Sequence, residues 1–322
     1  MNGPAEKTGR PPTLISISTG CFNEEENVES LRDQIDAIFQ QLPQYTYELI
    51  FIDNHSSDGT VEKIRAMAAR DKRVKLIVNA RNFGPIRSPF HALMLAKGAA
   101  VIAMASDLQD PPELIREFLA RWEEGHRIVV AVKKQSLESP AMWLVRRFYY
   151  WMLYKIAEIR VIQNFTGFGL YDRKVVEIIR GLEDPYPYFR GIIAEIGFEP
   201  FEVPFTQPLR RRGITKNNFY MLFDMAMLGI TSHSKVPIRL ATMGGFFLAF
   251  VSLMISLTYL SLKIVFWNTF SMGMAPLVIG VFFFGSVQLF FTGLLGEYVA
   301  AIHTQVLKRP HVVEQERLNF DD

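Results

Sequence analysis

Two long uncharged runs near the end of this chain constrain its fold more than any other feature. Leu240–Leu262 and Met272–Gly296 each extend for more than twenty residues without a charged side chain. About 20 apolar residues let a helix cross a bilayer, and so long a run without charge is rare in a buried helix of a soluble protein. The runs therefore predict a two-helix transmembrane hairpin over residues 236–303, with both of its ends on one side of the membrane.

The charges that flank these runs predict which side that is. Lys235 and Arg239 precede the first run, Lys308 and Arg309 follow the second, and the link between them holds only Lys263. Positive charge collects on the cytoplasmic side of membrane proteins. We therefore expect a protein of the inner (plasma) membrane with two spans, whose main domain and both termini are cytoplasmic.

The rest of the chain divides into a domain and two ends. Residues 13–235 carry nearly all of the charge and have the size of one globular domain. Residues 1–12 are polar, lack the apolar core of a signal peptide and are expected to be disordered. Residues 304–322 are expected to be a cytoplasmic tail, polar and loosely held from His311 onward.

Composition excludes several classes of function. The formal net charge of +2 gives no support for nucleic-acid binding. Cys21 is the only cysteine, so neither a disulfide framework nor a thiolate zinc site can form within the chain.

Strand and helix patterns alternate through the first hundred residues. Such alternation predicts an α/β domain with a parallel, Rossmann-like sheet, and in such sheets ligands bind at the carboxyl ends of the strands. Strands are expected at 14–19, 47–52, 74–78 and 100–104, and helices at 27–41, 61–70 and 89–97.

Polar clusters follow three of the expected strands: Asn23–Glu26, Asp53–Thr60 and Asp107–Asp110. Glu24 and Asp53 can accept hydrogen bonds from a base or a ribose. Asp58 stands in a Ser-Asp-Gly-Thr sequence that is typical of a turn, and we expect it to have that role alone.

The third cluster has two readings. Asp107 and Gln109 provide the hard oxygen ligands that a divalent ion needs in order to hold a diphosphate. Alternatively, Asp110 caps a helix whose first turn carries Pro111, Pro112 and Glu113. The sequence has no glycine-rich phosphate loop, so phosphates would need a metal and basic side chains instead.

Four motifs, taken in order, resemble the inverting GT-A glycosyltransferases of family 2. They are Phe22–Asn27, Phe51–Thr60, Arg81–Gly84 and Asp107–Pro112. The most similar branch is the polyprenyl-phosphate glycosyltransferases, which include bactoprenol glucosyltransferases and dolichol-phosphate mannosyltransferases, and the likeness continues through 213–216 and 293–298. It implies a cytoplasmic GT-A catalytic domain followed by two transmembrane helices.

The resemblance also implies roles for individual residues. The nucleotide sugar would bind at the strand ends and at basic positions downstream, a Mg²⁺ or Mn²⁺ ion would bind beside the diphosphate, and further basic residues would bind the lipid phosphate. Carried over by position, the nucleotide-sugar residues are Gly20, Phe22, Glu24, Asp53, Ala105, Ser106, Arg210 and Lys216; the metal ligands are Asp107 and Gln109; the lipid-phosphate residues are Lys133, Arg146 and Arg147; and Asp107, Gln109, Lys133 and Arg147 are the catalytic set.

The activity implied by the resemblance is transfer of one sugar to undecaprenyl phosphate with inversion at the anomeric carbon. Glucose from UDP-glucose is the favoured donor, and the bilayer is a partner. A homo-oligomer and a downstream flippase remain open as partners. Ala141–Ile159, rich in aromatic residues and arginine, is expected to lie in the headgroup layer, with a core helix as the alternative. Phe219–Ile230 is expected to be a second such helix.

Departures from the family pattern leave two other functions open. Ala105 and Gly167 stand where the family commonly has aspartate, Gly169 replaces an arginine, and Gly20 replaces a proline. A catalytically silent relative that acts as a membrane scaffold is therefore an alternative. Gln207–Arg210 is similar to an element of processive polysaccharide synthases, although two spans are few for a polymer channel.

Overall fold

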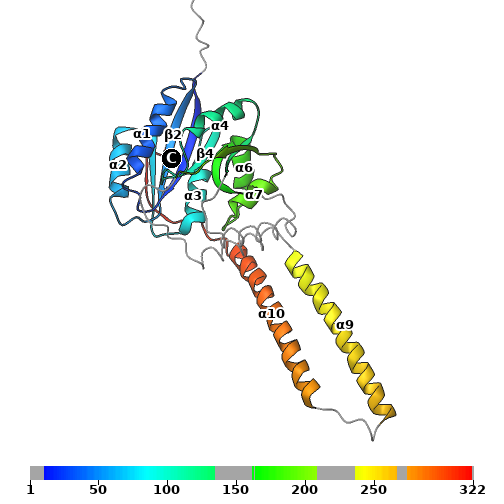
Figure 1. The fold of residues 1–322 in the computed structure, drawn as a ribbon. Helices are drawn as coiled ribbons and strands as arrows, with labels where there is room; N and C mark the ends of the chain where they lie inside the picture. The colour runs from blue at the N-terminus through cyan, green and yellow to red at the C-terminus, as the bar shows by residue number, and fades with distance from the viewer. Residues whose placement is uncertain (1–10, 135–161, 163, 209–235, 267–273, 321–322) are drawn as a thin grey trace, which may run out of the picture. The chain divides into compact units, whose positions relative to one another are not determined.

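The computed structural model describes residues 11–134, 162, 164–208, 236–266 and 274–320. These residues belong to two compact units. One unit contains a β-sheet flanked by helices and includes the C-terminal segment that begins at Lys308, and the other contains two long helices (Figure 1).

The sheet unit alternates strands and helices as the sequence predicts. Its elements are β1 (Thr13–Cys21), α1 (Val28–Phe39), β2 (Tyr45–Asp53), α2 (Thr60–Arg70), β3 (Val74–Asn79), α3 (Gly84–Leu95), β4 (Ala100–Ala105), α4 (Leu114–Glu123), β5 (Ile128–Lys133), β6 (Phe165–Asp172), α6 (Arg173–Gly181), α7 (Phe189–Glu195), β7 (Phe201–Phe205) and β8 (Glu314–Leu318).

The strand order is β7-β5-β6-β4-β1-β2-β3-β8. β1 pairs in parallel with β2 and β4, and β2 pairs in parallel with β3. The predicted Rossmann-like α/β architecture is confirmed, but the prediction of a wholly parallel sheet is wrong. β6 is antiparallel to β4 and β5, and β8 is antiparallel to β3. The chain moves outward from β1 to β3 and then crosses to β4, which makes the β1–β4 junction a topological switch point where ligands bind in such sheets.

The central strands are apolar on both faces because helices cover both faces. Leu49 and Phe51 of β2 pack in one buried cluster with residues of α1, α2 and α4. Ile50 and Ile52 pack in a second cluster with residues of α3, α6 and α7 (Figure 1). Successive strand residues point to opposite faces, so this run of four apolar residues contributes to both layers of the core.

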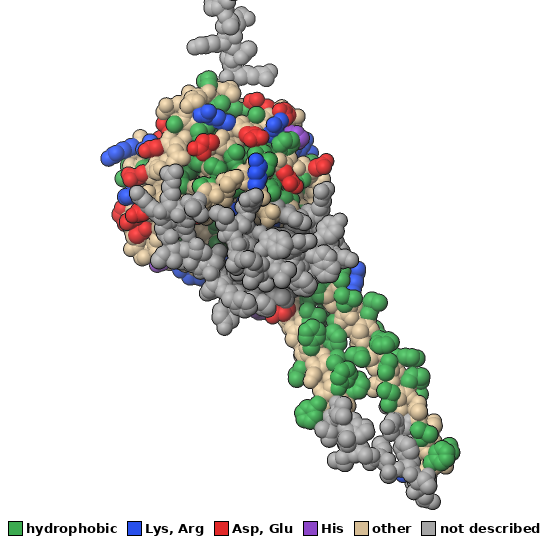
Figure 2. Space-filling model, in the orientation of Figure 1, with side chains coloured by type: hydrophobic (Ala, Val, Ile, Leu, Met, Phe, Trp, Pro, Cys, Tyr) green, Lys and Arg blue, Asp and Glu red, His purple; other side chains and the backbone are tan. Residues whose placement is uncertain are grey.

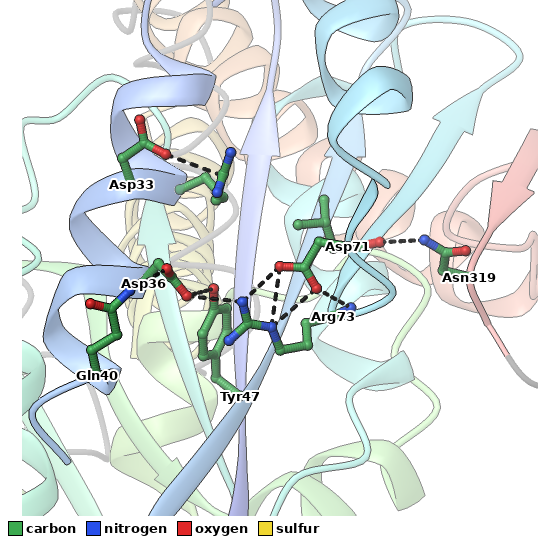
Figure 3. Close-up of polar contacts among 9 residues, drawn as sticks. Asp33, Asp36, Gln40, Tyr47, Asp71, Arg73 and Asn319 are labelled. Carbon is green, nitrogen blue, oxygen red and sulfur yellow. Dashed lines mark hydrogen bonds and ion pairs between the residues drawn. The ribbon is translucent and has the colours of Figure 1, made fainter. Parts of the chain in front are cut away.

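A polar network closes the sheet at the amino ends of the strands, opposite the predicted site. The Tyr47 hydroxyl donates to Asp36 at 2.9 Å, and the Arg73 guanidinium donates to Asp36 at 2.9 Å and to Asp71 at 2.8 Å (Figure 3). The hydrogen bonds from Arg73 lower the pKa of the Asp71 carboxyl below its ordinary value. These contacts hold α1, β2 and the entry to β3 together.

The C-terminal segment corrects one expectation, since residues 311–320 are not a loose tail. β8 pairs with β3, Glu314 contacts His91 at 2.6 Å, and Val312 is 5% exposed. The Asn319 side-chain amide donates to the carbonyls of Ala68 and Val74 at 2.7 and 2.8 Å, and one of these bonds is drawn in Figure 3. An edge strand with half-exposed faces can be polar, which is why the sequence of β8 gives no apolar strand signal.

The second unit contains α9 (Val236–Val265) and α10 (Met274–Val306). Each helix contains most of one predicted apolar run, and α10 ends three residues beyond the expected boundary at 303. Both helices are long and apolar enough to cross a membrane. Their described surfaces are largely apolar (Figure 2), with Phe246 73% exposed and Phe282 72% exposed. Apolar patches of this size are typical of surfaces covered by lipid or protein.

Candidate functional site

The carboxyl ends of β1, β2 and β4 meet at the switch point of the sheet. Gly20 pairs with Ala105 across the β1–β4 junction, and Cys21 pairs with Asp53 across β1–β2. The Ser106 hydroxyl donates to the Gly20 carbonyl at 2.8 Å. The structure therefore brings together four of the residues predicted to bind the nucleotide sugar.

Gly20 lies in a tight contact with α3. A Cβ atom at this position would be 2.9 Å from Cγ of Pro89, which is closer than real side chains approach. The sequence predicts a helix from Pro89 onward, but α3 begins five residues earlier at Gly84 and places Pro89 in its interior. Position 20, where the family commonly has proline, is glycine here, and Pro89 of α3 occupies the space that a side chain at this position would need.

The loops after β1 and β2 are joined by hydrogen bonds. The backbone N–H of Asn23 donates to the Ser56 hydroxyl at 2.9 Å, and that of Glu24 donates to the Thr60 hydroxyl at 2.9 Å. Asn23 has a φ of 56°, a left-handed conformation that asparagine tolerates better than most residues. Asp58 accepts from the N–H groups of Thr60 at 3.1 Å and Glu25 at 3.3 Å, so it joins the two loops besides forming the predicted turn.

Asp53 and Glu24 lie at this edge but are engaged within the protein. The Asp53 carboxylate is fully buried and accepts from the Ser56 N–H at 2.8 Å and from the Ser56 hydroxyl. Burial raises the pKa of the Asp53 carboxyl above its ordinary value, against the lowering effect of these bonds. Glu24 is 7% exposed and accepts from the Asn27 amide at 2.6 Å. In this conformation both carboxylates hold the loops that border the site.

The segment after β4 forms a closed turn. Asp107 Oδ1 accepts from the N–H of Gln109 at 3.1 Å, and Leu108 between them has a φ of 59°. Asp110 Oδ2 accepts from the N–H of Ala105 at 2.8 Å. Asp110 therefore ties the turn to β4, and its predicted role as a helix cap is wrong: α4 begins at Leu114, with Glu113 as its N-cap residue.

Asp110 is buried at this turn, and nearby charges act on its carboxyl. Burial raises the pKa of the Asp110 carboxyl to about 6, the charge of Asp107 raises it further, and the charge of Lys133 opposes the rise. Lys133 is the last residue of β5. The charges of Asp107 and Lys133, two residues predicted for the site, thus both act on Asp110, which the sequence assigned to a helix cap.

The donor set at this turn fits a metal shared with a substrate. Within the described residues, no group of three or more His, Cys, Asp or Glu side chains could hold an ion. Asp107 and Gln109 offer one carboxylate and one amide. Mg²⁺ is commonly bound through one or two carboxylates together with substrate phosphates and water, so this pair suits an ion whose remaining ligands come from a diphosphate.

An asparagine network beside the site is a feature that sequence reasoning missed. The Asn54 amide donates to Asn82 Oδ1 at 2.8 Å, and Asn54 Oδ1 accepts from the N–H of Phe83 at 2.8 Å. Asn79 donates to the Ser88 hydroxyl at 2.9 Å. The network joins the ends of β2 and β3 to the start of α3. Its signal in the sequence is asparagine directly after or at the end of two successive strands.

The glycines that replace family residues on β6 have structural consequences. Gly167 has a φ of 105°, a conformation that L side chains rarely adopt, and its carbonyl accepts from the Tyr171 hydroxyl at 2.8 Å. A Cβ atom at Gly169 would be 2.5 Å from the Val129 carbonyl oxygen of β5. The backbone of β6 is therefore built around glycine at both positions.

Of the remaining predicted residues, one lies within the described part of the chain and four lie outside it. Phe22 directly follows β1 and is half-buried at the same edge. Arg146, Arg147, Arg210 and Lys216, with the expected interfacial helices 141–159 and 219–230, lie outside the described residues.

Comparisons with known proteins give a consistent result. A model described as glycosyl transferase family 2 matches residues 16–177. A prophage-derived bactoprenol glucosyl transferase of Shigella flexneri is 33% identical over 93% of this chain and 96% of its own length. An uncharacterized glycosyltransferase of a Synechocystis species is 32% identical over 92% and 93% of the two chains. The putative glycosyltransferase CsbB of Bacillus subtilis is 32% identical over 94% and 92%.

Proposed function

This chain belongs to glycosyl transferase family 2, and from that premise we propose that it transfers one sugar from a nucleotide sugar to a polyprenyl phosphate in a membrane. The observation that carries the proposal is the match to a bactoprenol glucosyl transferase along nearly the whole of both chains. That match extends over both apolar helices as well as the sheet unit. A lipid acceptor would explain these helices, because its phosphate stays at the bilayer surface and the enzyme must be held there to reach it.

The donor side of the proposed reaction uses the switch point. Asp107 and Gln109 would hold a Mg²⁺ or Mn²⁺ ion, which supplies positive charge against the diphosphate that leaves. Lys133, at the end of β5, is proposed to add positive charge there. Arg210 and Lys216 are proposed from the sequence to grip the diphosphate as well, since arginine and lysine are the usual side chains for this purpose.

The chemical step requires no strong base from the protein. A phosphate monoester is anionic at neutral pH, so its oxygen attacks C1 of the sugar without first losing a proton to a side chain. The new C1–O bond forms on the face opposite the diphosphate, whose C1–O bond breaks and whose oxygen keeps the electron pair. Configuration at C1 is therefore inverted. Lys133, Arg146 and Arg147 are the residues proposed to bind the acceptor phosphate.

UDP-glucose is the donor we propose first, because the Shigella flexneri relative is named a bactoprenol glucosyl transferase. The test incubates the detergent-solubilised full-length protein with undecaprenyl phosphate and a panel of radiolabelled nucleotide sugars. We expect one donor to yield a lipid-phosphate monosaccharide, with one nucleoside diphosphate released per sugar transferred. Product from a different donor would correct the sugar while leaving the class of reaction intact.

The glycines of β6 favour one competing function. Because the φ of Gly167 and the close approach of the Val129 carbonyl to Gly169 disfavour the family's aspartate and arginine there, a catalytically silent relative with a scaffold role is the second candidate. Failure of every donor in the panel, with a stably folded protein, would favour that scaffold. Products that carry chains of several sugars would instead indicate a polysaccharide synthase.

A further inference from the structure

Two arginines lie over one aromatic ring at the start of α3, and the C-terminal segment brings a third arginine toward them. The guanidinium of Arg81 lies 4.1 Å from the centroid of the Phe83 ring, and that of Arg87 lies 5.3 Å from the same centroid. The Arg87 guanidinium also donates to the carbonyl of Pro310. Arg309, the residue before Pro310, is close enough for its charge to act on Arg87. All of these residues belong to the sheet unit.

The positive charge of this group is not balanced by carboxylates. Burial lowers the pKa of the Arg87 guanidinium, and the charges of Arg81 and Arg309 lower it further; only the Tyr186 side chain acts in the opposite direction. Among the residues that the structure describes, no ion pair involves Arg81, Arg87 or Arg309. The first turn of α3 carries no acidic residue either, so the positive end of its helix dipole adds to the same charge.

The group is accessible to an anion in solution or in a membrane. Arg81 and Arg309 are exposed, whereas Arg87 and Phe83 are half-buried. Lys308, next to Arg309, is exposed as well. Arg87 is thus held in place by its contact with Pro310, and Arg81 donates to the Asn82 carbonyl at 3.1 Å while its side chain stays exposed.

The position of Arg309 in the chain indicates the source of that anion. It follows Val306, the last residue of α10, by three residues, and three extended residues span only about 10 Å. If α10 crosses a bilayer, Arg309 therefore lies within reach of the headgroups at its end. Arginine close to the end of a membrane span is also typical of the cytoplasmic side of membrane proteins.

We propose that Arg81, Arg87 and Arg309, with Phe83, form a binding surface for the headgroups of anionic phospholipids. This arginine surface fastens the sheet unit to the lipid around the end of α10, and none of its residues is among those proposed to bind the acceptor phosphate. Anionic lipid attracts each basic residue near its surface appreciably. The proposal does not rest on sugar transfer, so it can be tested in a protein that shows no turnover.

The experiment measures the thermal unfolding midpoint of the full-length protein in mixed micelles. Phosphatidylglycerol replaces phosphatidylcholine in steps, and the lipid fraction that gives half of the maximal rise in midpoint is recorded. For the wild type we expect the midpoint to rise with phosphatidylglycerol and the rise to shrink at high salt. Each arginine removed should increase the required fraction about fivefold.

The test variant is Arg81→Gln with Arg309→Gln, which leaves the contact between Arg87 and Pro310 intact. Its matched control is Arg70→Gln with Arg116→Gln, which removes the same charge from exposed positions on α2 and α4. Midpoints in phosphatidylcholine alone report whether each variant is folded. Should the double variant fail to fold, the exposed single variant Arg81→Gln carries the comparison.

A rise that is lost in the test variant and kept in the control supports the arginine surface. An equal rise in both double variants, or no rise in the wild type, overturns it. Inorganic phosphate is titrated separately at matched concentrations. If it produces the same rise in the wild type, the surface binds soluble phosphate and the assignment to lipid is wrong.

Discussion

Asp110 shows how a single residue can shape a site at a cost to stability. Its carboxylate is 6% exposed and closes the β4 turn onto Ala105. Because burial raises its pKa to about 6, the folded protein keeps the proton in a pH range where the unfolded chain has lost it. Stability therefore falls as the pH rises from about 4 to about 6 and stays lower above that range.

The variant Asp110→Asn should remove this pH-dependent cost while keeping an oxygen that accepts from Ala105. At pH 7.5 we expect the variant to be more stable than the wild type by roughly 1–2 kcal/mol, part of the gain being lost to the buried amide donors. At pH 4 the advantage should disappear. Thermal unfolding in detergent with EDTA measures both; an equal difference at the two pH values would show that the carboxyl does not titrate as described.

Asp107 is predicted to act on the donor and not on the fold. It is only partly buried, and the Asp107→Ala change removes the carboxylate while leaving the Asp110–Ala105 bond in place. We expect sugar transfer to fall by at least about 100-fold, the loss typical for removal of one group that stabilises developing charge, with little change in the unfolding midpoint. Full activity in this variant would exclude the metal and diphosphate role.

Gly169 provides a test of packing between β5 and β6. Its missing side chain lets the Val129 carbonyl approach, so Gly169→Ala forces a backbone shift that should cost about 1–3 kcal/mol. Gly181→Ala is the matched control, because a Cβ there meets nothing within 4 Å. Chemical denaturation of the two variants should give clearly different midpoints. Equal midpoints would mean that β5 and β6 can move apart without a loss of stability.

For single residues, the sequence predicted the position in the fold better than the hydrogen-bond partners. The sequence puts Asp53 and Glu24 at the strand ends correctly, since strand ends follow from apolar runs. The hydrogen bonds that Asp53 accepts from Ser56 and Glu24 accepts from Asn27 depend on the local conformation of each loop, which the apolar pattern does not predict. The role of Asp110 was missed because a carboxylate before two prolines fits a helix cap equally well, and the turn that brings Ala105 within reach has Leu108 in a left-handed conformation that its residue type does not predict.

At the scale of elements, apolar strands were predicted well and polar or interrupted ones poorly. The buried strands β1 to β4 have continuous apolar runs, and their expected ranges agree closely with the structure. β6 contains Gly167 and Gly169, which weaken any strand pattern. β8 reads Glu-Gln-Glu-Arg-Leu and forms because the edge of β3 offers it a ladder of hydrogen bonds.

The C-terminal segment should contribute to the stability of the sheet unit through Val312. This side chain is 5% exposed in the core, whereas its neighbour Val313 is 53% exposed. Val312→Ala should lower the free energy of unfolding by about 1–2 kcal/mol, and Val313→Ala by less than about 0.5 kcal/mol. Denaturant titration of the two variants makes the comparison. Equal, small effects would show that the segment does not pack as part of the core in solution.

At the scale of the whole molecule, the division into a charged unit and an apolar hairpin was readable from hydropathy alone. The order of charges around the hairpin further predicts that the sheet unit and both termini are cytoplasmic. Cys21 is buried, so introduced cysteines can report this topology against a silent background.

A membrane-impermeant maleimide applied to intact cells should label Asn268→Cys, in the link between the spans, and not Gln315→Cys on β8. After the cells are opened, the exposed Gln315→Cys should react as well. Labelling of Gln315→Cys in intact cells would reverse the predicted orientation.

The place of β8 in the chain also governs the order of events during synthesis. β3 ends at Asn79, yet the strand that covers its outer edge begins at Glu314, after both long helices. At about 5–20 residues per second, the ribosome needs on the order of tens of seconds to deliver it. Throughout that interval the nascent sheet carries an uncovered edge, so the sheet unit can be completed only once the two long helices have left the ribosome. Chaperones that shield open strand edges would act in this window.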